Sequence, residues 1–90
     1  MYEYYTIYAW SDCPYCDKAK ELLTALNKQF AFCLVDESPQ LLSYLKNKHG
    51  WETVPLVFHH EKTDTGRWRS VFIGGYTNLE VALGGQSEDV

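Results

Sequence analysis

Basic residues are scarce in this 90-residue sequence, and none of them form a long run. Eight Lys and Arg stand against twelve Asp and Glu, which gives a formal net charge of −4. Nucleic acids and anionic membrane surfaces attract clustered positive charge. The charge balance therefore argues against nucleic acid or a membrane surface as a partner.

Long apolar runs are missing as well. No stretch approaches the ~20 residues that a transmembrane helix requires. The first residues read Met-Tyr-Glu-Tyr-Tyr-Thr, so no basic segment precedes an apolar one as it would in a secretory signal peptide. We therefore expect a cytoplasmic protein with no membrane partner. The length predicts a single domain over residues 1–90, and we expect a monomer.

Cysteine is limited to Cys13, Cys16 and Cys33. Small secreted scaffolds normally carry an even set of four or more cysteines, so a disulfide framework is not expected. A loop as short as the one between Cys13 and Cys16 also stabilises little through chain entropy. In a reducing compartment such a close pair is more often redox-active or metal-binding. The cysteine content therefore narrows the search for a functional site to this pair.

The pattern of residues predicts the element order β-α-β-α-β-β-α. Four segments rich in Tyr, Thr, Ile, Val and Phe read as strands, over residues 4–10, 30–35, 54–60 and 67–73. A β-α-β crossover makes a parallel pair, and a hairpin adds an antiparallel one. The expected fold class is α/β, a thioredoxin-like four-stranded mixed sheet flanked by helices.

Proline and glycine mark the ends of the expected helices. Pro14 and Pro39 each stand where the first turn of a helix tolerates a missing N–H, and Gly50 can supply a left-handed cap. Thr77 and Glu80 have the spacing of a capping box for a last helix, which must be short. The third and fourth strands are joined by a long hairpin with its turn at residues 63–66.

The Cys-Pro-Tyr-Cys spacing at a helix start suits a redox dithiol. Cys13 lies at the helix N-terminus, where unpaired N–H groups and the helix dipole favour the thiolate and lower the thiol pKa. Cys16 lies one turn later on the apolar side of the helix. We expect Cys13 to attack a disulfide and Cys16 to resolve the mixed disulfide.

A structural zinc pair and two inert cysteines are the other interpretations of this motif. Zinc takes about four ligands, and no second Cys-x-x-Cys is present. His59 and His60 are adjacent, so in a strand their side chains point to opposite faces. No metal is expected.

Three segments together resemble the signature segments of dithiol glutaredoxins. They are Cys13-Pro14-Tyr15-Cys16, Thr53-Val54-Pro55 and Gly74-Gly75-Tyr76-Thr77, in the family's order and on matching elements. The resemblance covers about residues 4 to 83. It implies a thiol–disulfide oxidoreductase with glutathione as co-substrate, acting in electron transport. The short chain and the run Cys-Asp-Lys-Ala-Lys-Glu-Leu-Leu also resemble compact phage-encoded members, which work in the host-cell cytoplasm.

The resemblance also implies a binding groove beside the dithiol. In that family the proline matching Pro55 is cis, and the backbone of the residue before it pairs with glutathione or an extended peptide. Glutathione would lie against these segments, its γ-glutamyl end held near the last helix; the residues implied are Tyr15, Thr53, Val54, Pro55, Gly75, Tyr76, Thr77 and Asn78. Expected partners are glutathione and disulfide-containing proteins, with ribonucleotide reductase as one example. Trp51 fits either the core or the rim of this groove.

The sequence departs from the family at four places. Trp10 replaces a basic residue, Glu52 places a negative charge beside Thr53, and Asn78 replaces an Asp that would meet glutathione's ammonium group. The hairpin is longer than usual, and Trp68 within it can either cover the sheet or contact a partner.

These departures keep other functions open. A thioredoxin-like reductant recycled by a flavoprotein reductase is the nearest alternative. An iron–sulfur carrier is a second, although Pro14 stands where such relatives have Gly or Ser. A binding module that uses the long hairpin is a third.

Overall fold

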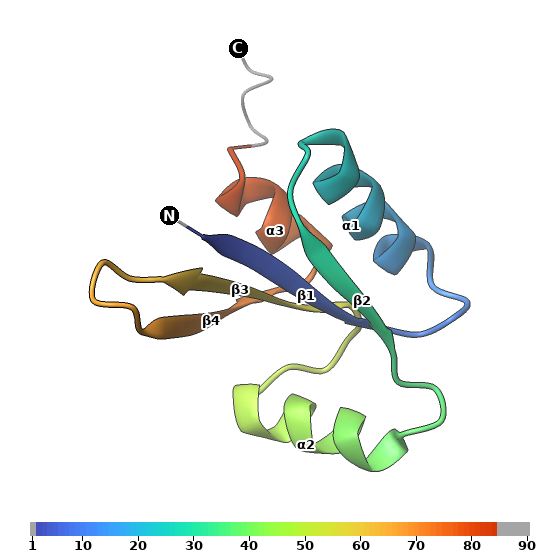
Figure 1. The fold of residues 1–90 in the computed structure, drawn as a ribbon. Coiled ribbons are helices and arrows are strands. Elements are labelled where there is room, and N and C mark those ends of the chain that lie inside the picture. Colours follow the sequence, from blue (N-terminus) through green and yellow to red (C-terminus); the bar gives the residue numbers. More distant parts are fainter. Residues whose placement is uncertain (1, 85–90) are drawn as a thin grey trace.

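The computed structural model of the protein describes residues 2–84, and Figure 1 traces its chain. The element order is the one that the sequence predicts. In chain order the elements are β1 (Glu3–Ala9), α1 (Pro14–Ala25), β2 (Phe30–Leu34), α2 (Pro39–His49), β3 (Leu56–Lys62), β4 (Trp68–Gly74) and α3 (Tyr76–Ala82).

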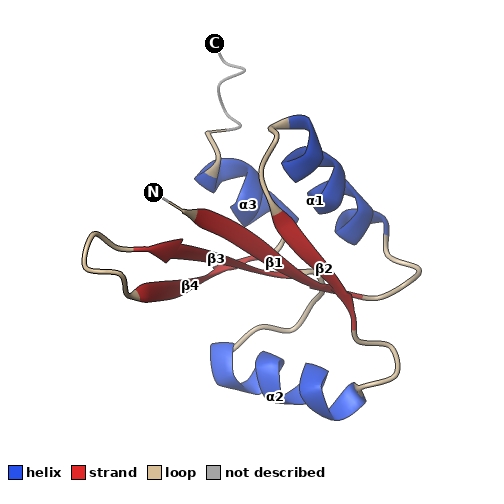
Figure 2. Ribbon diagram, in the orientation of Figure 1, coloured by secondary structure: helices blue, strands red, loops and turns tan. Residues whose placement is uncertain are grey.

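The four strands form one mixed sheet in the order β2-β1-β3-β4. β1 and β2 are parallel because α1 connects them by a crossover, whereas β3 runs antiparallel to both β1 and β4. Helices α1 and α3 cover one face of the sheet, and α2 covers the other (Figure 2). The predicted thioredoxin-like architecture is confirmed.

Two apolar clusters, one on each face, hold the layers together. Successive side chains of a strand point to opposite faces, so β1 contributes to both clusters. Ile7 and Ala9 pack against α1 and α3, while Tyr8 packs toward α2. The buried residues on the α1 and α3 face are Tyr5, Ile7, Ala9, Cys16, Ala19, Leu23, Val57 and Leu79. The cluster beneath α2 is smaller and contains Val35, Leu42, Leu45 and Leu56.

The start of α3 differs from the prediction. The helix begins at Tyr76 with Gly75 as its N-cap, so Thr77 and Glu80 both lie inside it and the predicted capping box is wrong. The backbone N–H of Gly75 instead donates a hydrogen bond to the Asn78 side-chain oxygen at 3.1 Å. The reason is the sharp turn at Gly74, whose φ of 124° is open to glycine. That turn starts the helix immediately after the strand.

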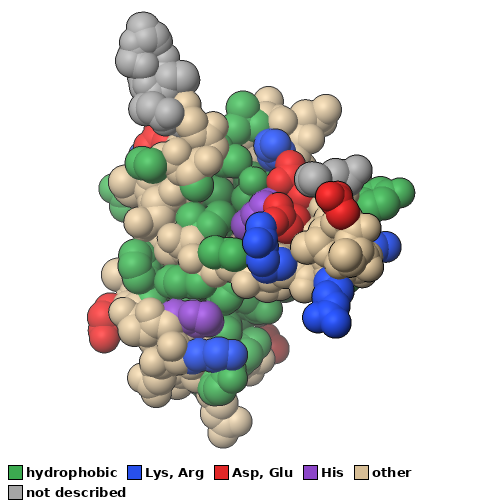
Figure 3. Space-filling view, turned by 90° about the vertical axis from the view of Figure 1, so that its left-hand side faces the viewer, with side chains coloured by type: hydrophobic (Ala, Val, Ile, Leu, Met, Phe, Trp, Pro, Cys, Tyr) green, Lys and Arg blue, Asp and Glu red, His purple; other side chains and the backbone are tan. Residues whose placement is uncertain are grey.

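The hairpin of β3 and β4 reaches the end of the sheet that lies opposite the start of α1 (Figure 1). Glu61 and Arg69 pair across its strands. Trp68 is exposed, but its ring meets the edge of Tyr4 with 5.5 Å between ring centroids. Acidic and basic side chains lie close together on the surface at this end (Figure 3).

Candidate active site

Cys13 and Cys16 are joined by a disulfide at the start of α1. Cys13 is the N-cap residue with extended backbone, and Pro14 occupies the first turn. The Cα atoms of the two cysteines lie 5.2 Å apart, and the backbone N–H of Cys16 donates to the Cys13 sulfur at 3.1 Å. Cys16 is completely buried, whereas Cys13 is half-buried. Only one of the two sulfurs is therefore open to an incoming molecule.

Exposure and electrostatics both distinguish the two sulfurs. A sulfur at a helix N-terminus faces the unpaired N–H groups of the first turn and the positive end of the helix dipole. Cys13 occupies this position and accepts the Cys16 N–H. Negative charge on sulfur is stabilised there, which is the condition for a reactive thiolate.

A pocket of about 320 Å³ has in its wall Tyr15, which lies between the two cysteines in the chain. Its walls come from the start of α1, from the segment between α2 and β3, and from the start of α3. All eight groove residues expected from the sequence line this one pocket: Tyr15, Thr53, Val54, Pro55, Gly75, Tyr76, Thr77 and Asn78. The fold thus brings together three segments that are far apart in the sequence. The Val54–Pro55 peptide bond is cis, as the resemblance implied.

Trp51 also lines the pocket, and sequence reasoning left its place open. Its indole lies behind Gly75, where a Cβ on that glycine would be 3.6 Å from the ring. The ring also meets Phe72 edge-on at 5.5 Å. Its indole nitrogen is buried and has no hydrogen-bond partner within residues 2–84. Trp51 therefore belongs both to the core beneath α2 and to the wall of the pocket.

Asn78 has its side-chain oxygen engaged inside the protein. That oxygen accepts the Gly75 N–H, and the side chain lies close against Gly74. An Asn side chain has one oxygen acceptor and one NH₂ donor. One lone pair of the oxygen is used by Gly75, so a ligand at this end of the pocket meets a neutral amide with one acceptor site left.

Two positions where the sequence departs from the family lie outside the pocket lining, while one basic side chain lies at the rim. Trp10 is 47% exposed, and Glu52 is exposed next to Thr53; neither lines the pocket. The Lys18 ammonium lies 5.1 Å from the ring centroid of Tyr15 and 6.0 Å from that of Tyr76. A positive charge therefore stands at the rim of the pocket.

Comparison with known proteins decides the family. The family model described as Glutaredoxin matches residues 5–63, which contain the dithiol and the Thr53-Val54-Pro55 segment. This chain belongs to the glutaredoxin family.

Relatives and solved glutaredoxin structures agree with this assignment. Glutaredoxin-1 of Rhizophagus irregularis is 40% identical over 55 residues, which are 58% of this chain and 54% of that protein. A dithiolic glutaredoxin of Trypanosoma brucei brucei matches in structure with a TM-score of 0.67 at 30% identity. The match covers 94% of this chain and 81% of that one. The chain spans 54 to 62% of the length of the curated relatives it matches.

The fold also occurs in a glutaredoxin-like protein with a different activity profile. NrdH-redoxin from Escherichia coli, whose profile is thioredoxin-like, matches with a TM-score of 0.60 at 23% identity. The match covers 88% of this chain and 91% of that one. At this identity the likeness shows the shared fold alone.

Residues 2–84 contain neither a group of side chains suited to a metal ion nor a helix suited to crossing a membrane. Within that range, no three His, Cys, Asp or Glu side chains are grouped so that they could hold a metal ion. None of its helices has the length and hydropathy that crossing a bilayer requires.

Proposed function

We propose that this glutaredoxin is a thiol–disulfide oxidoreductase in which Cys13 is the nucleophile and Cys16 the resolving cysteine. The observation that carries the proposal is the asymmetry of the pair. Cys13 is reachable and accepts a backbone N–H at a helix N-terminus, whereas Cys16 is completely buried one turn behind it. An accessible thiolate backed by a buried thiol is the arrangement that disulfide exchange requires.

The reaction starts from the reduced protein. The Cys13 thiolate attacks one sulfur of a substrate disulfide, the substrate S–S bond breaks, and the departing thiolate takes up a proton. Cys16 then loses its proton and attacks the Cys13 sulfur of the mixed disulfide, which releases the second substrate thiol. Two electrons pass to the substrate, and the protein is left with the Cys13–Cys16 disulfide seen here.

Glutathione is the proposed co-substrate. Two glutathione thiols would reduce the Cys13–Cys16 disulfide and leave as glutathione disulfide. In the groove, the backbone of Val54 would pair with an extended peptide, and the γ-glutamyl end would lie near Thr77 and Asn78. Substrates would be glutathione mixed disulfides and protein disulfides, ribonucleotide reductase among them. The cytoplasm suits this chemistry because its thiols are kept reduced, and we propose that the protein works there as a monomer.

A second candidate is a thioredoxin-like reductant that a flavoprotein reductase recycles. Asn78 favours it, because a neutral amide can offer glutathione's ammonium group a hydrogen bond but no negative charge. The exposed Glu52 would also repel a glutathione carboxylate. NrdH-redoxin from Escherichia coli, which shares this fold, has a thioredoxin-like activity profile.

The test is turnover of a glutathione mixed disulfide with glutathione and glutathione reductase. We expect wild-type turnover, its loss in Cys13→Ser, and its retention in Cys16→Ser, since a glutathione mixed disulfide needs only the first cysteine. Cys16→Ser should lose the reduction of insulin disulfides. Cys33→Ser is the matched control, because Cys33 is free.

Two results would contradict parts of the proposed function. Full turnover by Cys13→Ser contradicts the assignment of the nucleophile. Negligible turnover with glutathione, together with insulin reduction driven by thioredoxin reductase, establishes the second candidate in place of glutathione dependence.

A further inference from the structure

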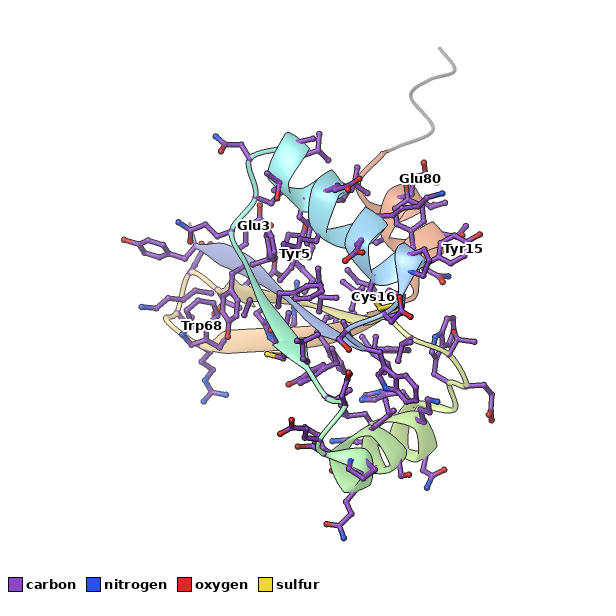
Figure 4. The ribbon with its side chains drawn as sticks, turned by 90° about the vertical axis from the view of Figure 1, so that its right-hand side faces the viewer. Glu3, Tyr5, Tyr15, Cys16, Trp68 and Glu80 are labelled. Carbon is purple, nitrogen blue, oxygen red and sulfur yellow. A yellow bond between two sulfur atoms is a disulfide. The ribbon has the colours of Figure 1, made fainter. Side chains whose placement is uncertain are left out.

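Lys18 stands at the junction of two aromatic rings that line the groove. Its ammonium is 5.1 Å from the Tyr15 ring centroid and 6.0 Å from the Tyr76 centroid, and these two rings are 6.1 Å apart. Tyr15 is at the start of α1 and Tyr76 at the start of α3. Figure 4 shows Tyr15 and Cys16 on the same side of the molecule, far from Trp68. The charge is therefore held on the side from which a substrate approaches the dithiol.

Three other basic side chains have partners elsewhere. Lys20, two residues further along α1, lies over Phe32 of β2 at 4.9 Å. Lys28 pairs with Glu3, and Arg69 pairs with Glu61 on the hairpin. Within residues 2–84, Lys18 forms no ion pair with a carboxylate. Its charge is thus uncompensated by direct contact, although the chain as a whole is acidic.

We propose that Lys18 selects substrates by binding a carboxylate that the disulfide substrate carries near the sulfur attacked by Cys13. This inference rests on the proposed function of Cys13. The carboxylate can come from a small thiol such as glutathione or from an acidic side chain of a protein, and the ammonium recognises the same group in either. Two electron-rich ring faces keep the lysine ammonium at the rim, where it attracts an anion before the sulfur is reached.

We expect the Lys18 charge to change the rate of reaction only moderately, because Lys18 is exposed. Exposed ion pairs typically contribute 0.2–1 kcal/mol, which corresponds to a rate ratio of up to about fivefold. Asp17 and Glu21 on the same helix, and Glu52 next to the groove residue Thr53, act in the opposite direction. The net preference therefore has to be measured on substrates that differ only in charge.

The experiment follows the fluorescence change when the reduced protein reacts with small disulfides. Dithiodipropionate is anionic, and hydroxyethyl disulfide is its neutral counterpart. The measured quantity is the ratio of the anionic to the neutral rate constant within each protein, so a general change in reactivity cancels. We expect Lys18→Met to lower this ratio about threefold, Lys18→Arg to restore it, and Lys20→Met to leave it at the wild-type value. The difference between Lys18→Met and wild type should shrink in high salt.

Two further substrate pairs identify the source of the carboxylate. Glutathione disulfide is compared with its ester, and a disulfide-bridged peptide bearing Glu beside Cys is compared with its Gln form. Dependence on Lys18 in either pair supports the proposal and names the source. An unchanged ratio in Lys18→Met for every pair overturns it, and so does an equal fall in Lys18→Met and Lys20→Met. Failure of the reduced wild type to react with the neutral disulfide would count against the proposed function itself.

Discussion

The carboxylate of Asp36 accepts hydrogen bonds from both the backbone N–H and the hydroxyl of Ser11. The backbone nitrogen is 3.0 Å from one carboxylate oxygen and 3.2 Å from the other, and the hydroxyl contacts the second. Asp36 follows β2, and Ser11 lies two residues before Cys13. The end of one strand therefore fixes the loop that leads into the dithiol.

Removal of the Asp36 carboxylate should loosen this loop. We expect Asp36→Ala to lower the free energy of unfolding by about 1 kcal/mol, because a charged acceptor of exposed donors is lost. It should also slow the alkylation of Cys13 in the reduced protein, since the loop no longer holds the cysteine at the helix N-cap. Urea denaturation and iodoacetamide kinetics measure the two effects. Glu37→Ala is the matched control on the neighbouring exposed residue, and equal results for both variants would contradict the role of Asp36.

Gly74 and Gly66 offer a matched pair of glycines with positive φ. A Cβ at Gly74, where φ is 124°, would lie 2.8 Å from the Asn78 side chain, whereas a Cβ at Gly66, where φ is 87°, meets nothing within 4 Å. Gly66→Ala should cost about 1 kcal/mol of stability from its backbone alone. Gly74→Ala should cost at least about 1 kcal/mol more, because Asn78 must move and release the Gly75 N–H. Chemical denaturation measures both; similar losses would show that the Asn78 contact is unimportant.

Substitution of Asn78 by Asp should raise the preference for glutathione. One carboxylate oxygen can keep the hydrogen bond from Gly75, and the second brings a negative charge to glutathione's ammonium group. We expect the KM for a glutathione mixed disulfide to fall about fivefold, which corresponds to about 1 kcal/mol. The measured quantity is the ratio of kcat/KM for that substrate to kcat/KM for insulin. Asn78→Ala has no side-chain oxygen and should not raise the ratio. An unchanged ratio in Asn78→Asp would show that residue 78 does not contact glutathione.

His60 should make the stability of the protein depend on pH. Its ring bridges the Thr6 hydroxyl at 2.9 Å and the Ser70 hydroxyl at 2.6 Å. Burial, followed by the charge of His59, lowers the pKa of His60 below its ordinary value of 6.5. The unfolded chain therefore binds the proton more readily, so stability is lost as the pH falls below about 6.5 and stops falling below the pKa of the folded state.

The variant His60→Gln isolates this effect. Glutamine can form hydrogen bonds but does not titrate, so its free energy of unfolding should fall less than that of wild type between about pH 7.5 and about pH 5. Denaturation curves at several pH values give the difference, in which the contributions of the other groups cancel. Parallel pH profiles for the two proteins would show that His60 is not responsible.

Local features of the sequence were enough to predict the element order. Strand-forming segments, prolines at the helix starts and the Cys13–Cys16 spacing act through neighbouring residues, so their consequences are visible without the fold. The eight residues that line the pocket were expected together because the three segments that carry them resemble those of a family. The start of α3 was missed because Thr77 and Glu80 fit a capping box locally, while the turn at Gly74 starts the helix earlier.

Tertiary structure alone decided which side chains meet across long separations. Lys18 and Lys20 point to opposite sides of α1, and the burial of Ala19 and Leu23 against the sheet decides that Lys18 faces the groove and Lys20 faces β2. Ser11 and Asp36 are 25 residues apart. These contacts depend on how the layers pack together, which no local pattern encodes. The sequence by itself determined the chemistry of the dithiol, and the packing of the helices on the sheet determined which charge stands beside it.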